Sequence, residues 1–385
     1  MKPFTFMLIA GEPSGDRLAA ELVKALKSDR ACAGARFFGA GGKEMSKAGV
    51  DIVVDMTEHS VIGLWEVVKR YGTFKRLFDQ LLRVALERRP DVLVCVDFSG
   101  FNRRFAQRLR WEIAVQPGAF GGWRSRIVQF VSPQVWASRP GRARQMARDF
   151  DLLLCIFPFE KPWYAERVPE LRVEFVGHPM IDRFEVQSSK LKIQNETPVV
   201  LLLPGSRVGE LNRHLPVMLE AGRRIMADRA VAFRMVLPEE ALAARAREQL
   251  GNASQIKVQA GGLPEALQHA DLAIASTGTV TLECAFFGVP AVTLYKTSWG
   301  TYQIARRIVK VNSLTMPNLL AGEPVFPEFI QDAATPENLA RAALELLKDP
   351  ARRQAIQSKL GKLVATLGEP GACRRAAEAI VSLLK

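Results

Sequence analysis

Short apolar segments alternate with amphipathic, helix-like segments along the chain, in two blocks that a polar stretch separates. Apolar runs of about five residues, bounded by glycine, proline or polar residues, are typical of buried parallel strands. The first block predicts strands over 4–10, 36–39, 91–97, 127–131 and 152–157. The second block predicts strands over 199–203, 233–237, 256–258, 272–275 and 291–295. Helices are predicted between the strands, and also over 336–348 and 351–367.

This alternation predicts an α/β fold with two doubly wound, Rossmann-like domains that face each other across a cleft. We expect the first domain over residues 1–185 and the second over 198–367, with the polar stretch 184–197 as a linker. A break at 368–372 precedes a last helix, and we expect this helix, within 369–385, to join the first domain.

A turn that can bind an anion follows the first strand of the second block. The run 199–203 enters Pro204-Gly205-Ser206-Arg207, and a helix follows. Such a turn leaves backbone N–H groups pointing at one place, which favours phosphate. Ser206 can cap the helix, and Arg207 adds a forked, permanently charged donor that suits a pyrophosphate.

A second turn of this kind follows about seventy residues later. The strand 272–275 enters the small, hydroxylated turn Ser276-Thr277-Gly278-Thr279, and a helix-like segment follows. Two anion-binding turns in one half of the chain suggest a site for a nucleotide diphosphate. The alternative is that both are ordinary turns of a parallel sheet.

The first block opens with a strand, the glycine-containing loop 11–16 and a helix, as dinucleotide-binding units do. The loop lacks the G-x-G-x-x-G fingerprint, which disfavours a nicotinamide or flavin cofactor. Asp97 ends the strand 91–97, and catalytic groups of open α/β sheets gather at such ends. A lone aspartate there is more often a helix cap or a loop anchor, so both interpretations stay open.

The segment 61–84 is amphipathic and carries an unusually bulky apolar face between lysines and arginines. This pattern suits a surface that takes acyl chains or rests on anionic lipid. The alternative is a helix that packs on the core and leaves its basic face in solvent. The membrane or acyl-chain candidates are Ile62, Trp65, Val68, Tyr71 and Phe74.

The formal net charge of the 385-residue chain is +13, which favours a phosphorylated substrate, an anionic membrane or nucleic acid as partner. Arg139, Arg142, Arg144 and Arg148 recur without an interleaved carboxylate, which suits an anionic partner; the alternative is a solvated helix face. The sequence has no helix-turn-helix, RRM or zinc-finger signature, so we expect no nucleic acid.

The five cysteines and four histidines are scattered without metal-ligand spacing. We therefore expect no metal site, and buried thiols in a reducing compartment. Since no run approaches the roughly 20 apolar residues of a spanning helix, and the N-terminus is too short for a secretory signal, we expect a cytoplasmic protein that touches a membrane surface.

Ten short motifs occur in a fixed order along the chain. They lie at 11–16 (GEPSGD), 39–45, 60–63 with 66–67, 96–97 with 101–102, 131–137 (VSPQVWA), 158–161, 176–179, 203–207 (LPGSR), 278–279 with 282–283, and 316–319. On these motifs the chain resembles the lipid A disaccharide synthases of Gram-negative bacteria over essentially its whole length. Each motif alone is weak, but ten in order are highly specific.

The resemblance implies a metal-independent, inverting glycosyltransferase of the GT-B type that needs no cofactor. Such an enzyme transfers 2,3-diacylglucosamine from UDP-2,3-diacylglucosamine to 2,3-diacylglucosamine 1-phosphate, giving the β-1,6-linked disaccharide 1-phosphate and UDP. The second domain would hold the donor. The first would hold the acceptor and face the anionic inner surface of the inner membrane. A homodimer is a further candidate state.

The resemblance also implies roles for particular residues. The donor-binding candidates are Ser206, Arg207, Thr277, Gly278, Thr279, Glu283 and Asn318. Arg207 would stabilise the departing UDP, and Glu283 would reach the ribose. Asp97 is the candidate general base, with Asp16 as the alternative. The remaining acceptor or loop candidates are Glu12, Ser14, Gly15, Asn102 and Ser132.

The chain departs from the family's pattern at two places on the acceptor side. The usual proline after the catalytic-region aspartate is absent, giving Phe98-Ser99-Gly100, and the loop 116–126 looks longer. Three alternatives stay open: another UDP-sugar GT-B protein such as a non-hydrolysing UDP-N-acetylglucosamine epimerase, a nucleic-acid-binding protein, and a lipid-binding protein that lost the chemistry.

Overall fold

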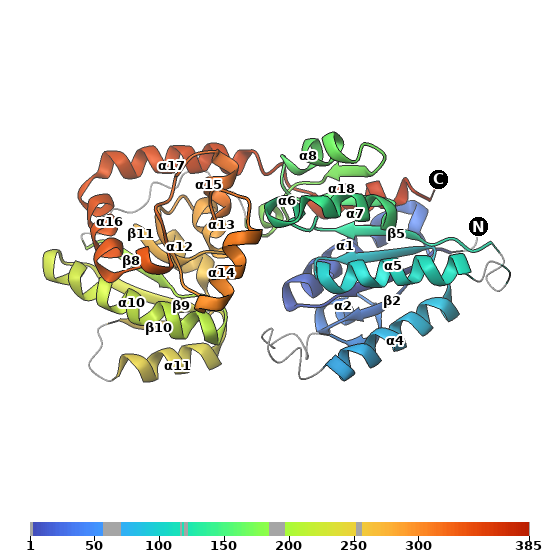
Figure 1. Cartoon of the computed structure of the whole chain (residues 1–385), viewed down its shortest axis with the longest axis horizontal. Coiled ribbons are helices and arrows are strands. Elements are labelled where there is room, and N and C mark those ends of the chain that lie inside the picture. Colours follow the sequence, from blue (N-terminus) through green and yellow to red (C-terminus); the bar gives the residue numbers. More distant parts are fainter. Residues whose placement is uncertain are drawn as a thin grey trace. The chain divides into compact units, whose positions relative to one another are not determined.

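The structure is a computed structural model that describes residues 3–56, 71–115, 118, 122–184, 197–251 and 256–384 (Figure 1). It divides into two compact units. Unit 1 comprises Met1–Glu185 and Leu367–Lys385, and unit 2 comprises Val186–Thr366. Each unit has its own parallel sheet and its own buried core.

The sheet of unit 1 has, within the described residues, seven parallel strands in the order β3-β2-β1-β4-β5-β6-β7. The strands are β1 (Thr5–Ala10), β2 (Arg36–Gly41), β3 (Asp51–Asp55), β4 (Val92–Val96), β5 (Arg126–Phe130), β6 (Leu152–Cys155) and β7 (Arg172–Phe175). The helices are α1 (Pro13–Ser28), α2 (Lys43–Lys47), α4 (Tyr71–Arg88), α5 (Ser99–Val115), α6 (Val135–Ser138), α7 (Ala143–Asp149), α8 (Glu160–Arg167), α9 (Met180–Arg183) and α18 (Ala372–Val381).

The apolar runs of the sequence correspond to the central strands of unit 1. Every residue of β1 and β4 is buried, as expected for strands that helices cover on both faces. The glycine-rich stretch after residue 38 serves packing: Gly39, at φ 150°, brings β2 so close to β1 that a Cβ would lie 1.9 Å from the carbonyl oxygen of Leu8. The sequence pattern misses β3 and β7 because both are partly exposed edge strands whose polar residues interrupt the apolar run.

The sheet of unit 2 has, in the described part of the chain, six parallel strands in the order β10-β9-β8-β11-β12-β13. The strands are β8 (Val199–Leu203), β9 (Ala232–Leu237), β10 (Lys257–Ala260), β11 (Leu272–Ser276), β12 (Ala291–Tyr295) and β13 (Glu328–Ile330). The helices are α10 (Val208–Asp228), α11 (Glu240–Leu250), α12 (Leu263–Gln268), α13 (Thr279–Phe286), α14 (Trp299–Ile308), α15 (Met316–Ala321), α16 (Pro336–Lys348) and α17 (Pro350–Ala365).

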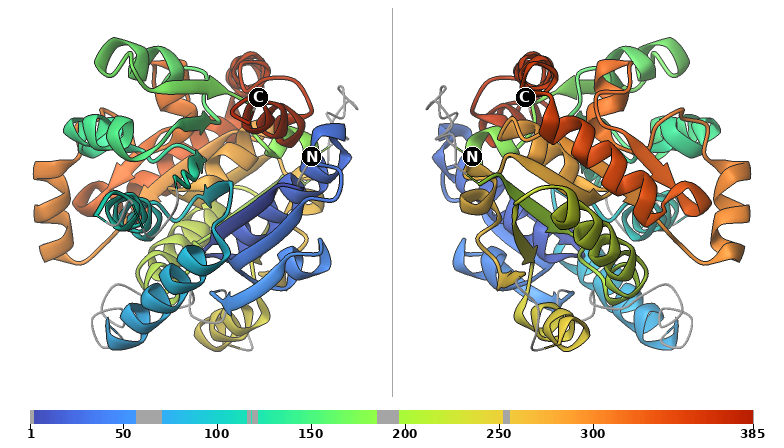
Figure 2. Two further views of the ribbon diagram at one scale, coloured as in Figure 1. Left: turned by 90° about the vertical axis from the view of Figure 1, so that its right-hand side faces the viewer. Right: turned by 90° about the vertical axis from the view of Figure 1, so that its left-hand side faces the viewer.

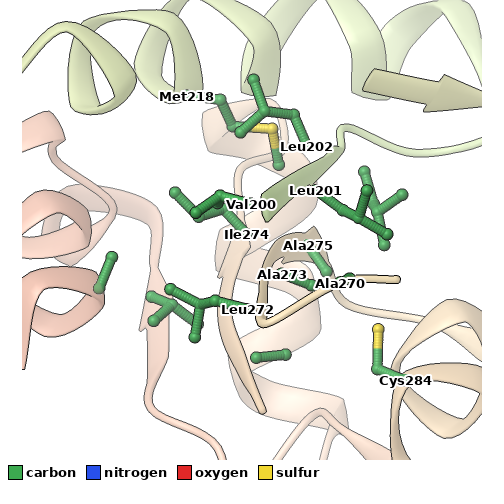
Figure 3. Close-up of a cluster of buried hydrophobic side chains, with 14 of the residues drawn as sticks. Val200, Leu201, Leu202, Met218, Ala270, Leu272, Ala273, Ile274, Ala275 and Cys284 are labelled. Atoms are coloured by element: carbon green, nitrogen blue, oxygen red, sulfur yellow. The ribbon is translucent and has the colours of Figure 1, made fainter. Parts of the chain in front are cut away.

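The core of unit 2 is built on β8 and β11. Both strands are buried along their whole length. Figure 3 shows their side chains between Met218 of α10 and Cys284 of α13, which come from helices on the two faces of the sheet. This packing fixes the positions at which β8 and β11 end, and therefore the places where the turns after them begin.

The C-terminal helix belongs to unit 1. Helix α18 packs on α1, and the two chain ends lie close together in Figure 2. Its N-cap residue is Gly371, at φ 100°, which has no side chain for capping. The carboxylate of Asp182 replaces the missing cap, because it accepts hydrogen bonds from the N–H groups of Gly371 and of Ala372, the latter at 3.0 Å.

We expect the substitution Asp182→Ala to lower the free energy of unfolding by about 1 kcal/mol, since it leaves two N–H groups of α18 without an acceptor. Asp182→Asn keeps one acceptor oxygen and should cost less. Urea unfolding of both variants measures the difference. An alanine variant as stable as the wild type would show that Asp182 does not hold this helix.

Candidate functional site

The strand order of unit 2 reverses between β8 and β11. From β8 the chain continues to β9 and β10 on one side, and β11 to β13 lie on the other. Leu203 pairs with Ala275, so the turn after β8 and the turn after β11 emerge next to each other at the same edge. Ligands of open α/β sheets bind at such reversal points.

The first of these turns presents Arg207 to solvent. Gly205, at φ 123°, makes the bend, and Glu210 accepts the N–H of Ser206 at 3.0 Å. Ser206 and Arg207 are exposed, and Arg207 is the N-cap residue of α10. The guanidinium of Arg207 forms no ion pair with any described residue. An unpaired guanidinium at a helix N-terminus favours an anionic ligand.

The second turn depends on the backbone conformation of its glycine. Gly278, at φ 144°, is the N-cap residue of α13, and its carbonyl accepts the hydroxyl of Thr281 at 2.7 Å. Thr279 is exposed and Thr277 half-buried. Glu283 lies one turn into the helix, is half-buried, and already interacts within the chain. Both sequence-predicted anion turns therefore lie side by side at one sheet edge.

A buried histidine connects the first turn to the end of β12. His214 is fully buried; its Nδ1 donates to the carbonyl of Pro204 at 2.8 Å, and its Nε2 accepts the N–H of Lys296 at 3.0 Å. This bonding pattern is that of the neutral ring, and burial lowers the pKa of His214. A single histidine on a long amphipathic helix gives no signal in the sequence, so the pattern misses this residue.

Asn318 has no hydrogen-bonding group left for a nucleotide. Its Nδ2 donates to Phe326 O and Glu328 Oε1, both at 2.8 Å, and its Oδ1 accepts from the N–H groups of Val325 and Phe326. The side chain is buried. In this structure Asn318 therefore holds the segment before β13, and the nucleotide contact expected from the resemblance stays a prediction.

The strand order of unit 1 reverses between β1 and β4. Ala10 pairs with Val96, so the loop after β1 and Asp97 after β4 lie side by side. The contact is close, since a Cβ on Gly11 would lie 2.3 Å from the ring of Phe98. The surrounding protein and then the negative charge of Glu12 raise the pKa of Asp97, which brings this carboxylate closer to the range useful to a general base.

The backbone at the ends of β4 and β5 is strained. Asp97, Phe98 and Val131 have φ values of 47°, 42° and 69°, which side-chain-bearing residues rarely adopt. Two buried amides hold this conformation, because Nδ2 of Asn102 and Nε2 of Gln129 donate to the carbonyl of Asp97 at 2.8 and 3.0 Å. Such strain clusters at functional sites. Sequence reasoning names Asn102 but misses Gln129.

Asp16, the alternative base, has its carboxylate occupied by the backbone. It is buried and accepts the N–H groups of Gly42, Glu44 and Met45 at 2.7, 2.9 and 3.2 Å. It thereby caps α2 and holds the glycine-rich turn, which is a structural role. In the same loop Gly15 is buried and Ser14 is exposed.

Ser132 lies in the loop that follows β5. Its hydroxyl is buried and lies 3.1 Å from the hydroxyl of Tyr164. Beside it the buried Glu160 accepts the indole N–H of Trp136 at 3.1 Å, and burial raises the pKa of Glu160 to about 7. The hydrogen bonds of Ser132 and Glu160 therefore hold the loop 131–137 in place.

The membrane candidates fall mostly outside the described residues. This holds for Ile62, Trp65 and Val68, and for the side chain of Tyr71 at the start of α4. Phe74 is half-buried and packs against the core of unit 1, as the core-helix alternative expects. Within the described ranges, no helix has the length and apolarity to cross a membrane. The same ranges contain no cluster of three or more His, Cys, Asp or Glu side chains that could hold a metal ion.

Comparison with known proteins decides the family. Residues 6–382 match the family model described as Lipid-A-disaccharide synthetase. The lipid-A-disaccharide synthase of Myxococcus xanthus is 36% identical over 392 residues, which cover 99% of this chain and 98% of that protein. The chain belongs to the lipid-A-disaccharide synthase family. The synthase of Solibacter usitatus is 38% identical over 390 residues, with coverage of 98% and 97%.

Solved structures confirm the predicted GT-B fold. The glycosyltransferase of kitacinnamycin matches with a TM-score of 0.60 at 18% identity and covers 99% of both chains. A UDP-N-acetylglucosamine 2-epimerase from Neisseria meningitidis matches at 0.55 and 12%, covering 100% of this chain and 99% of that one. The epimerase alternative thus shares the fold, while the family match confirms the prediction of a UDP-sugar-dependent hexosyltransferase that forms the lipid A disaccharide.

We expect His214→Leu to lower the free energy of unfolding by about 2 kcal/mol, because it leaves the Pro204 carbonyl and the Lys296 N–H unpaired in the core. The affinity for UDP, measured by calorimetry, should fall with it, since the Arg207 turn loses its anchor. Unchanged UDP affinity would contradict this role.

The pH dependence of stability gives an independent check on His214. The unfolded chain takes up a proton on this ring near pH 6.5, whereas the folded chain does so only at lower pH. Wild-type stability should therefore decrease as the pH falls below about 6.5, and the decrease should be smaller in His214→Leu.

Proposed function

We propose that unit 2 binds the UDP-linked donor at its two adjacent turns, and that unit 1 binds the lipid acceptor and supplies Asp97 as the general base. The donor is UDP-2,3-diacylglucosamine, and the acceptor is 2,3-diacylglucosamine 1-phosphate. The observation that carries this proposal is the strained Asp97 at the reversal point of unit 1, whose pKa the surrounding protein and Glu12 raise.

On the donor side the diphosphate would meet Arg207 and the N-termini of α10 and α13. The N–H groups of a first helical turn have no partner within the helix, and they stabilise negative charge. This charge grows on the diphosphate as the sugar leaves, so Arg207 would act more strongly in the transition state than in the ground state. Ser206, Thr277 and Thr279 would supply further hydrogen bonds.

On the acceptor side the reaction needs a hydroxyl proton to be removed. The 6-hydroxyl oxygen of the acceptor forms the bond to C1 of the donor sugar, and its proton passes to the carboxylate of Asp97. The bond between C1 and the diphosphate oxygen breaks, and UDP leaves with the electron pair. Because attack and departure take place on opposite faces of C1, the configuration inverts.

The roles of Asp97 and Asp16 separate in a pair of variants. We expect Asp97→Asn to reduce kcat by about 10² or more with UDP affinity and stability unchanged, since the side chain keeps its shape and loses its basicity. Asp16→Asn should lower the melting temperature, because it removes one acceptor oxygen from the cap of α2, and leave most of the turnover. A loss of turnover in Asp16→Asn with wild-type stability would assign the base to Asp16 instead.

The neighbour of Asp97 should shape the pH profile. Glu12 contributes to the raised pKa of Asp97, and the reaction needs Asp97 ionised. We therefore expect kcat/KM to fall as the pH drops through that raised pKa, and Glu12→Gln to move this acid limb to lower pH. A limb that stays in place or moves to higher pH would contradict the pairing of these two carboxylates.

We further propose that the protein lies peripherally on the inner face of the inner membrane. Besides the amphipathic sequence pattern that includes residues 61–70, helix α14 of unit 2 supports this membrane contact. Trp299 and Ile304 on this helix are 75% and 62% exposed, and Arg306 and Arg307 lie in its last turn. A helix that carries an exposed tryptophan and arginines is typical of a segment that lies in the headgroup region of anionic lipid.

Trp299→Ser with Ile304→Ser should weaken binding to phosphatidylglycerol vesicles, measured by co-sedimentation, and leave stability unchanged because α14 buries none of its residues. The matched control is Trp111→Ser on α5, whose tryptophan is 51% exposed. Equal losses in the control and the double variant would rule out α14 as the lipid contact.

A further inference from the structure

Three arginines surround a cavity beside the N-terminus of α5. The cavity has a volume of about 210 Å³. Its wall includes Ser99, Gly100 and Arg103 of α5, Gln134, and Arg139 and Arg142 from the segment before α7. We call this cavity the arginine pocket.

The positive charges of the arginine pocket are not neutralised within the described structure. None of Arg103, Arg139 and Arg142 has a carboxylate within ion-pairing distance among the described residues. Arg103 donates to the neutral amide of Gln145 at 3.2 Å. Burial, and then the like charges around it, lower the pKa of Arg142. Like charges that face one cavity destabilise the fold unless an anion binds between them.

Helix α5 adds backbone N–H donors to the arginine pocket. Ser99 and Gly100 form the first turn of the 17-residue α5, and their N–H groups have no acceptor among the described residues. A Cβ on Gly100 would meet nothing within 4 Å, so the backbone there is open to a ligand. Helix N–H groups together with guanidinium groups are the donors that phosphate prefers.

We propose that the arginine pocket binds the 1-phosphate of the acceptor, an inference that rests on the proposed function of unit 1. Asp97 lies two residues before Ser99, so a phosphate at this helix end would leave the base next to the same bound sugar. The acceptor carries its phosphate on C1 and its reacting hydroxyl on C6, at opposite ends of one hexose.

The pocket would also distinguish the two substrates. Donor and acceptor share the diacylglucosamine unit and differ in what C1 carries, a UDP group or a terminal phosphate. A terminal phosphate offers three free oxygens to the arginines and the helix N–H groups, whereas each phosphate of the UDP group offers only two, so the pocket would favour the acceptor over the donor lipid.

The test uses a double variant that carries both Arg139→Gln and Arg142→Gln. The control is the single variant Arg144→Gln. Arg144 is exposed on α7 and is not part of the pocket wall. We expect the double variant to raise KM for the acceptor about tenfold or more while KM for the donor stays unchanged. It should also lose the preference of the wild type for 2,3-diacylglucosamine 1-phosphate over the phosphate-free lipid. An unchanged acceptor KM would overturn the proposal.

Two further measurements separate this proposal from its alternatives. Calorimetry with glucosamine 1-phosphate and with glucosamine needs no turnover, and we expect only the phosphate to bind, and only while the arginines are present. This result would support phosphate binding by the arginine pocket even if the wild type formed no disaccharide. A failure to form disaccharide would reject only the proposed function. The double variant could instead lose binding to phosphatidylglycerol vesicles, with an equal rise in KM for the donor and for the acceptor. This outcome would identify a site for lipid headgroups and overturn the proposal.

Discussion

Parallel strand pairing is the interaction on which both candidate sites depend. Ala10 pairs with Val96 in unit 1, and Leu203 pairs with Ala275 in unit 2, each time where the strand order reverses. Parallel strands end at the same sheet edge, so loops that are far apart in sequence emerge together at these two places. Because the chain then turns to opposite sides, the space above the edge stays free for a ligand. The topology of each sheet therefore decides where the chemistry can take place.

Buried polar side chains hold the loops at these edges. The backbone there has left the sheet and needs other hydrogen-bond partners. Asn102 and Gln129 supply them to the carbonyl of Asp97, Asp16 to the turn before α2, and His214 to the turn that carries Arg207. The hydrogen bonds of Asn102 and Gln129 keep Asp97 in a backbone conformation that costs of order 1–3 kcal/mol. A site that is fixed before the substrate binds needs little reorganisation during the reaction.

The central strands and the positions of the two turns after β8 and β11 could be predicted from the sequence, because they depend on local patterns: apolar runs, and the glycine and serine that follow them. The edge strands β3, β7 and β13 could not, because they are short or partly exposed and carry no clear apolar run. Local pattern also cannot tell a polar residue that meets a ligand from one that satisfies distant backbone. The carboxylate of Asp16 and the amide of Asn318, for example, bond to backbone N–H groups, and their contacts with substrate stay predictions. For the same reason the roles of Gln129 and His214 could not be predicted, because their partners become neighbours only in the folded chain.

We propose that this chain joins two diacylglucosamine lipids, with its donor on one unit and its base on the other. The most direct test mixes the purified chain with UDP-2,3-diacylglucosamine and 2,3-diacylglucosamine 1-phosphate in the presence of EDTA, and identifies the lipid products by mass spectrometry. We expect a disaccharide monophosphate and an equal amount of free UDP. Release of UDP without disaccharide, or no reaction by a protein that still binds UDP, would contradict it.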